Sequence, residues 1–149
     1  MSGSLPTLLL LSHFAATLFM LGVIWFVQIV HYPLFAKTGC ADFRVYEQRH
    51  AALTTWGVAP PMLWEVITAL LLFWFKPTGV LPWQLAVGLA LLAVIWLSTA
   101  LVQVPCHNVL SKDFNSVVQR RLVRTNWIRT AAWTLRGLLV FWMAMPSLR

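Results

Sequence analysis

Three histidines and one glutamate lie where they could perform metal or acid–base chemistry. His31 and His107 each end an apolar stretch and His50 begins another, so all three are expected at one end of the molecule. Glu47 precedes His50 by three residues, which places both side chains on one face of a helix. Imidazole and carboxylate groups together could hold a transition metal, and two facing imidazoles could ligate haem iron. The simpler alternative is that polar residues near helix ends reach interfacial water.

Glu65 and Arg136 are charged residues in the middle of two long apolar stretches. Glu65 lies ~20 Å along its helix, and Arg136 is expected at the same depth. A charge at the centre of a bilayer costs about 2.5–3.5 kcal/mol by insertion measurements, so both side chains should face the interior of the molecule. They could form a structural ion pair, bind an oxygen-bearing substrate or move protons.

The last apolar stretch has one polar face. Arg129, Trp133 and Arg136 recur at helical spacing, and Asn126 extends the same face toward the histidine end. Because lipid would not tolerate this face, it is expected to look inward. Inward arginines suit an anion, a quinone carbonyl or a phenolate. We therefore predict four catalytic residues: Glu65, Asn126, Arg129 and Arg136.

Two tryptophans and two glutamines could line a binding space between the helices. Trp64 and Trp133 lie deeper than the interfacial belts where aromatic residues gather, so they could wall a cavity for a flat ligand. Packing against the core or lipid is the commoner use of a deep tryptophan. Gln28 and Gln103 lie near the histidines that end the first and third stretches, and their simplest role is hydrogen bonding between helices. His13 lies too far along the first stretch to join the histidine group.

The elements that must position these residues are helices that cross a membrane. The 149-residue chain is 60% hydrophobic and 10% charged, whereas soluble domains carry about 25% charged residues. Four apolar stretches approach the ~20 residues that a transmembrane helix needs, and they cover residues 7–30, 51–75, 81–105 and 127–145. No alternating strand pattern occurs in the sequence. It predicts one all-α domain over residues 1–149, a bundle of four transmembrane helices.

The net charge of +7 is distributed as in a membrane protein rather than a nucleic-acid-binding one. Most basic residues lie in or beside the first and third connections, and basic residues stay in the cytoplasm. We therefore expect a multi-pass protein of the bacterial inner membrane with both termini outside and the histidine-rich side in the cytoplasm. Residues 40–50 and 113–125 are expected to be amphipathic cytoplasmic segments. The expected partners are the lipid bilayer and a lipophilic small molecule, and no nucleic-acid partner is expected. Assembly into a homo-oligomer is left open by the sequence.

A weak internal repeat relates the two halves of the chain. Residues 27–37 match residues 102–112 at an offset of 75, and a second offset of 71 pairs Gln48 with Gln119 and Glu65 with Arg136. Chance is the competing explanation, because two apolar hairpins share much composition. The pattern favours two duplicated helical hairpins about a pseudo-twofold axis along the membrane normal. The second half lacks counterparts of the first half's glutamate and histidine ligands, so a symmetric two-metal site is not expected.

Short motifs in the second half resemble known families. The stretch Val102–Leu110, VQVPCHNVL, with the later TNWIRT from Thr125 and WTLR from Trp133, looks like uncharacterised small four-helix membrane proteins of bacteria. More distantly, the chain is similar to the anthrone-oxygenase-like family, small four-helix proteins with Asn or His shortly before an Arg in the last helix. Asn126 and Arg129 would fill that pattern. The resemblance implies oxidation of an aromatic or quinone-like molecule within the membrane, in some members without a metal.

These features together favour a membrane-embedded oxidoreductase, oxygenase-like, that acts on a lipophilic aromatic or quinone-type substrate. Its pocket is expected within the bundle, entered from the cytoplasmic end and floored by Glu65 and Arg136. The second hypothesis is a metal- or haem-binding membrane protein. Its expected ligands are His31, His50, His107 and Glu47. A third is a small transporter or a subunit of a larger membrane complex. The sequence leaves three alternatives for the cofactor: a transition metal, a haem or no cofactor.

Overall fold

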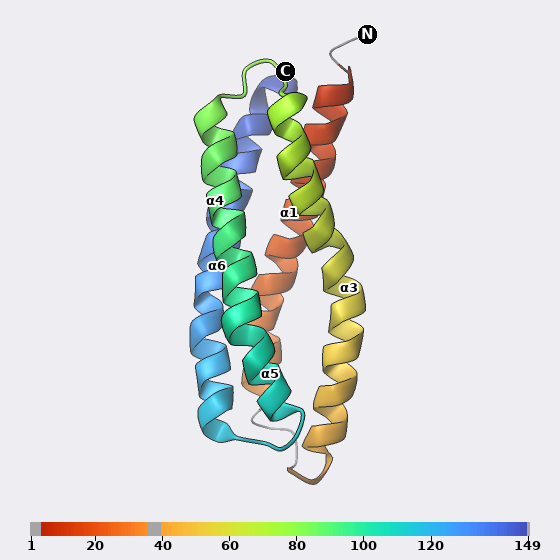
Figure 1. Cartoon of the computed structure of the whole chain (residues 1–149), viewed down its shortest axis with the longest axis vertical. Helices are drawn as coiled ribbons and strands as arrows, with labels where there is room; N and C mark the ends of the chain where they lie inside the picture. Colours follow the sequence, from red (N-terminus) through yellow and green to blue (C-terminus); the bar gives the residue numbers. More distant parts are fainter. Residues whose placement is uncertain (1–3, 36–39, 149) are drawn as a thin grey trace.

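The apolar stretches fold into four long helical rods that lie side by side (Figure 1). The computed structural model describes residues 4–35 and 40–148, and no strand occurs within these ranges. The first rod is α1 (Ser4–Phe26), a π-helix η1 (Val27–His31) and α2 (Tyr32–Leu34), and the second is α3 (Cys40–Trp74). The third is α4 (Pro82–Ser98), a π-helix η3 (Thr99–Gln103) and α5 (Val104–Leu110), and the fourth is α6 (Ser116–Ala144) with a 3-10 turn η4 (Met145–Leu148).

The rods form a ring in which α1 packs against α3 and α6, and α4 packs against α6 and less closely against α3. Both chain ends lie at one end of the bundle, and α5 lies at the other, which we call the histidine end (Figure 1). Three clusters of buried apolar residues follow one another along the axis and include Leu72, Met62 and Phe43 respectively. The looser contact between α3 and α4 leaves room for a side opening.

Prolines explain the two π-helical turns. η1 ends two residues before Pro33, and η3 ends two residues before Pro105. In each wide turn a backbone N–H bonds to the carbonyl five residues back, from Tyr32 to Val27 and from Val104 to Thr99. Because proline has no N–H and its ring crowds the preceding turn, a wider turn lets the helix continue past it. The first and third helices therefore run beyond the predicted ends at residues 30 and 105.

The second and fourth helices begin earlier than predicted. The segments 40–50 and 113–125 were expected to be separate from helices 51–75 and 127–145, but α3 starts at Cys40 and α6 at Ser116. No helix-breaking residue separates the parts, and the apolar side chains of the early turns pack into the cluster at the histidine end. Asn115 caps α6, since its side chain accepts the N–H groups of Val117 and Val118. Pro60 and Pro61 lie inside α3, which runs through them without restarting.

Three helical stretches are long and apolar enough to cross a membrane: Leu5–Leu34, Phe43–Trp74 and Pro82–Leu110. Large apolar side chains such as Leu53, Leu101 and Leu138 are exposed on the outside of the bundle. A surface of this kind suits lipid, because a soluble protein rarely exposes a large contiguous apolar area. α6 is comparably long at 29 residues but carries more arginines than these three stretches.

Candidate functional site

The Glu65–Arg136 pair lies in the middle of the bundle, where the sequence predicted two charges at one depth. An Arg136 Nη2 atom lies 3.2 Å from Glu65 Oε1, and both side chains are fully buried. Thr17 Oγ1 donates to the same oxygen at 2.9 Å, and Trp133 Nε1 donates to Glu65 Oε2 at 3.0 Å. Both carboxylate oxygens are therefore occupied by donors of the protein itself.

His13 completes this buried network. Its Nε2 lies 3.3 Å from Arg136 Nη2, and because arginine only donates, Nε2 must accept and the ring proton is on Nδ1. His13 Nδ1 then donates to Thr68 Oγ1 at 2.7 Å, and Thr68 donates its own proton to the Trp64 carbonyl at 2.6 Å. From its position in the sequence, His13 was expected to lie apart from the histidine group, and its place in this network was not predicted. The usable signal was its position one turn before Thr17, on the same helical face.

The network is closed. Arg136 Nη1 donates to the Gly88 carbonyl, and the space beside Arg136 and His13 is about 10 Å³. A cavity needs at least about 10–15 Å³ of accessible volume to hold one water, so no ligand larger than water fits there. Of the three uses considered for Glu65 and Arg136, this arrangement favours the structural ion pair.

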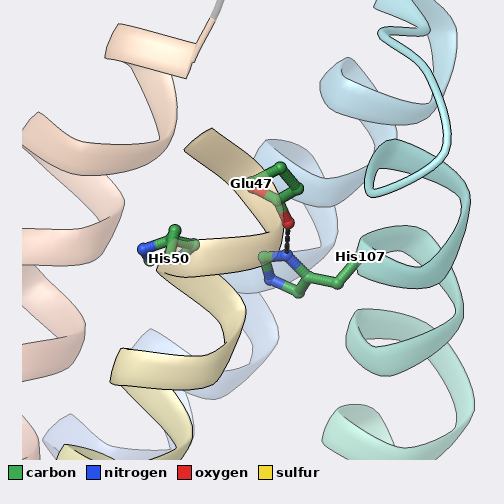
Figure 2. Close-up of side chains that lie close together, drawn as sticks. All are labelled: Glu47, His50 and His107. Carbon is green, nitrogen blue, oxygen red and sulfur yellow. Dashed lines mark hydrogen bonds and ion pairs between the residues drawn. The ribbon is translucent and has the colours of Figure 1, made fainter. Parts of the chain in front are cut away.

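The predicted metal-binding residues meet at the histidine end, where η1, α3 and α5 bring them together. Figure 2 shows three of them, Glu47 and His50 from α3 and His107 from α5. His31 Nε2 lies 3.0 Å from His50 Nδ1. His107 Nδ1 lies 2.5 Å from Glu47 Oε1, and His107 Nε2 lies 3.0 Å from the Tyr32 hydroxyl. Glu47 and His50 share a face of α3, as their spacing predicted.

The donors and acceptors of this group can be assigned. An ionised Glu47 only accepts, so His107 carries its proton on Nδ1 and its Nε2 accepts from the Tyr32 hydroxyl. Glu47 is 0% exposed, and its second oxygen, Oε2, has no hydrogen-bond partner among the described residues. One ligand atom each from Glu47, His50 and His107 lie within 4.8 Å of one another. Sequence reasoning missed Tyr32, although it stands between His31 and the proline that causes the wide turn.

A cavity of about 330 Å³ lies beside this group, between α3 and the α4–α5 rod. Val58, Met62 and Val104 contribute apolar wall. Its polar lining comes from ten residues: Tyr32, His50, Thr54, Thr55, Trp96, Thr99, Gln103, His107, Asn108 and Arg129. Neither Glu65 nor Arg136 occurs among the described lining residues, so the expectation of a pocket floored by that pair is wrong. Glu65 and Arg136 lie deeper along the bundle than the cavity, one turn beyond Met62 on α3 and two turns beyond Arg129 on α6.

Three residues that line the cavity hold polar atoms without a partner in the described part of the chain. These atoms are Arg129 Nε, Gln103 Oε1 and Trp96 Nε1. Arg129 is 8% exposed and Gln103 is 1% exposed. Buried polar atoms in folded proteins are nearly always paired, so each exception calls for an explanation such as a ligand or an ordered water. The three residues also line the cavity, but the unpartnered atoms themselves are covered, so a ligand there would reach them only after their side chains rotate.

Arg129 is held in place at the inner edge of the cavity. Its guanidinium lies 5.4 Å from the centre of the Trp133 ring, within the range of a cation–π contact. It also lies near enough to the Tyr32 hydroxyl to interact with it. Arg129, Trp133 and Arg136 are all buried, so the prediction that this face of α6 looks inward is confirmed.

Asn126 and Gln28 pair with each other instead of lining the cavity. Asn126 Nδ2 donates to Gln28 Oε1 at 2.9 Å, and Gln28 Nε2 donates to the Val123 carbonyl at 3.3 Å. Gln103 differs, because it lines the cavity and donates to Thr125 Oγ1 at 3.1 Å. The simple role of bonding between helices therefore describes Gln28 well and Gln103 in part.

Trp64 does not wall an interior space. Its side chain is 46% exposed on the outside of α3, so the expected interior position is wrong. Successive residues of an α-helix are about 100° apart, and Glu65 occupies the inward position. Trp133 is the tryptophan that lies inside, where it joins the Glu65 network to Arg129.

Comparisons with models of known protein families, with curated proteins and with solved structures found no match for this chain. The similarity to anthrone-oxygenase-like proteins therefore rests on the short motifs alone.

Proposed function

We propose that the protein is a membrane-embedded oxidoreductase, oxygenase-like, that binds a lipophilic phenol or quinol in the cavity beside the histidine group. The observation that carries this proposal is that one largely apolar cavity is lined by three residues, Arg129, Gln103 and Trp96, each of which holds a buried polar atom without a partner among the described residues. Its volume of about 330 Å³ is within the range of about 300–1,000 Å³ typical of small-molecule pockets. Apolar walls would hold the rings, and the polar atoms would hold an oxygen.

The unpartnered atoms match a hydroxyl group in number and sense. A hydroxyl donates one hydrogen bond and accepts two. Gln103 Oε1 is an acceptor, whereas Arg129 Nε and Trp96 Nε1 are donors. Arg129 would also stabilise a phenolate by charge-assisted hydrogen bonding. A phenolate is more easily oxidised than its phenol, so this site would favour transfer of electrons from the ring to oxygen.

The overall reaction balances with molecular oxygen as oxidant. A quinol gives two electrons and two protons to O₂, which forms the quinone and hydrogen peroxide. An anthrone takes one oxygen atom at its methylene carbon and releases the other as water. The closed network around Glu65 and Arg136, with its space of about 10 Å³, favours an enzyme over a transporter, because transport needs a continuous path.

We also propose that α6 is a fourth membrane span and that the histidine end is cytoplasmic. The arginines deep within α6 are buried, whereas its outward residues Leu135, Leu138 and Phe141 are exposed and apolar. Arg120 and Arg124 are exposed at the histidine end, and basic residues favour the cytoplasmic side. Both termini would then be outside, in a bacterial inner membrane.

Duplication of a helical hairpin would explain two features of the fold. Each half has a π-turn that ends two residues before a proline, η1 before Pro33 and η3 before Pro105. Each half also sends a glutamine across to a backbone carbonyl of the other. Gln48 donates to Ser111 at 3.1 Å, and Gln119 donates to Tyr32 at 3.1 Å. The pairing of Gln48 with Gln119 in the repeat supports a pseudo-twofold axis along the bundle.

Oxygen consumption by the purified protein tests the proposed reaction. With a naphthoquinol or anthrone we expect catalysed oxygen uptake, and Arg129→Gln should slow it by roughly ten- to a hundredfold, since it removes a charged hydrogen bond. Arg124→Gln is the matched control, because this exposed arginine lies on the same helix, and it should match the wild type. No uptake above background with either substrate, or equal rates for both variants, would overturn the proposal.

A further inference from the structure

We infer that Glu47, His50 and His107 bind one divalent transition-metal ion at the edge of the cavity. Their ligand atoms lie within 4.8 Å of one another. Two imidazoles and one carboxylate, with open positions left over, are the ligand set of non-haem ferrous sites. Metal binding itself does not depend on the proposed oxidation, but a role for the metal in that reaction would rest on it.

The buried carboxylate is an independent reason to expect a cation. Glu47 is 0% exposed, and one of its oxygens, Oε2, has no partner in the described residues. Burial of an ionised carboxylate is costly unless each oxygen is compensated. His107 compensates only Oε1, and a metal ion between the two residues and His50 would compensate both oxygens.

Each ligand imidazole is already oriented through its other nitrogen. His50 Nδ1 lies 3.0 Å from His31 Nε2 and 3.1 Å from Thr54 Oγ1, which leaves His50 Nε2 for the metal. His107 Nε2 lies 3.0 Å from the Tyr32 hydroxyl. Metal binding through Nδ1, on the side of Glu47, would move the ring proton to Nε2, which would then donate to the Tyr32 oxygen. Histidines that ligate metals nearly always have such a second hydrogen bond, and it sets their tautomer. We therefore assign His31 to the surroundings of the metal rather than to its ligands.

Binding requires the ligand side chains to move, because their ligand atoms are spread over up to 4.8 Å. Neighbouring ligand atoms around an octahedral ion lie about 3.0 Å apart when metal–nitrogen bonds are about 2.1 Å. Glu47 Oε1 and His107 Nδ1 lie 2.5 Å apart, so they would separate by roughly half an ångström while His50 closes in. His50 and His107 both line the cavity, so the open positions of the ion would face the bound substrate and oxygen.

The ligand types restrict the choice of metal. Nitrogen and oxygen ligands suit borderline divalent ions such as Fe²⁺ and Zn²⁺, whereas softer Cu⁺ prefers thiolate. Cys106 precedes His107 in sequence but is not part of the ligand group found among the described residues. Ferrous iron is the occupant that an oxygen-consuming enzyme would use.

The test is metal binding by the full-length protein in detergent. Chelator-treated protein is loaded with ferrous ammonium sulfate without oxygen, desalted and analysed for iron, and the nitric oxide adduct is examined by electron paramagnetic resonance. We expect about one iron per chain and the signal of a mononuclear high-spin iron–nitrosyl centre. Less than roughly a tenth of an iron per chain, with the protein folded, would overturn the site.

Variants localise the metal. The ligand variants His50→Gln and Glu47→Gln should each lower iron retention by more than a hundredfold. His31 orients a ligand without binding the metal, so His31→Gln should lower iron retention by roughly ten- to a hundredfold. Arg49→Gln, at an exposed position of α3, is the control and should bind like the wild type. His50 is half-buried, so its variant should keep the fold, which gel filtration and helical circular dichroism would check. Wild-type retention by both ligand variants would overturn the proposal.

Activity separates this inference from the proposed function. Oxygen uptake that persists after iron is removed would overturn a role for the metal and leave the oxidoreductase standing. Stoichiometric iron binding without any quinol or anthrone oxidation would support the metal site and overturn the oxidoreductase.

Discussion

Arg129 and Arg136 lie two turns apart on one face of α6 but have different surroundings. Arg136 is bonded by Glu65, His13 and a backbone carbonyl in a closed space. The Nε atoms of both arginines have no partner among the described residues, but only Arg129 borders a cavity large enough for a ligand. Sequence alone treats the two as equal charges, whereas their surroundings assign structure to one and ligand binding to the other.

Removing one charge of the closed pair should destabilise the protein. Glu65→Gln leaves Arg136 buried without a counter-charge, which costs about 3–5 kcal/mol. The measurement is unfolding of the purified protein in mixed detergent and dodecyl sulfate. The double variant Glu65→Gln with Arg136→Met should regain part of the loss, because no charge is then left unpaired. Single variants as stable as the wild type would contradict a structural ion pair.

Trp96 tests the cavity without removing a charge. Its indole N–H has no partner among the described residues, so Trp96→Phe removes no internal hydrogen bond. Apart from the effect of the lost ring volume, the free energy of unfolding of the ligand-free protein should stay within about 0.5 kcal/mol of the wild-type value. Affinity for a naphthol should fall by roughly two- to tenfold, the value of one neutral hydrogen bond. Binding is followed by quenching of tryptophan fluorescence. Affinity equal to that of the wild type would show that this N–H does not contact the ligand.

At the scale of the elements, the two π-turns set the direction of the site residues. One extra residue in a turn changes the rotational phase of everything after it by about 100°. Tyr32 follows η1 directly, and His107 lies four residues after η3. A regular α-helix through both prolines would turn these side chains away from α3. The wide turns are therefore part of the site, as is common for π-bulges.

Pro105→Ala should weaken the histidine group. Alanine restores an N–H, so η3 can narrow to an α-helical turn and rotate His107 away from Glu47. We expect iron retention to fall at least tenfold, as for a misplaced ligand. Pro82→Ala is the control, because Pro82 is in the first turn of α4, where proline and alanine are both tolerated. Unchanged iron binding in Pro105→Ala would show that other contacts hold the wide turn.

At the scale of the whole molecule, the bundle has two chemically different ends. The closed ion network extends from the middle toward the terminal end, and the histidine half holds the cavity and most of the exposed basic residues of the described chain. The cavity lies between α3 and the α4–α5 rod, in the histidine half. A lipophilic substrate could then enter between these helices without leaving the membrane.

Cysteine labelling tests the proposed orientation. In a background without Cys40 and Cys106, Thr78→Cys should react with an impermeant maleimide in intact cells, because it lies in the turn at the terminal end. Asn115→Cys, in the turn before α6, should react only after permeabilisation. The reverse pattern would invert the topology, and labelling of both sites from one side would contradict a span by α4.

Several features could be read from the sequence, because they depend on local periodicity. The length of the apolar stretches predicts the helices, and helical spacing predicts that Arg129 and Arg136 face inward. The position of each histidine along its helix predicts that three of them share one end. Residue spacing along a helix is a local property, so these conclusions do not depend on how the helices pack.

Tertiary structure decided how each helix is rotated and what each polar atom meets. That rotation turns Trp64 outward, pairs Asn126 with Gln28 and adds His13 to the Glu65 network. It also brings Tyr32 to His107 and leaves a cavity where α3 and α4 separate. The sequence determined at which level along the bundle each polar residue lies. Packing decided which of them are satisfied by the protein and which remain for a ligand, because partners across helices depend on rotational phase and on the π-turns that shift it.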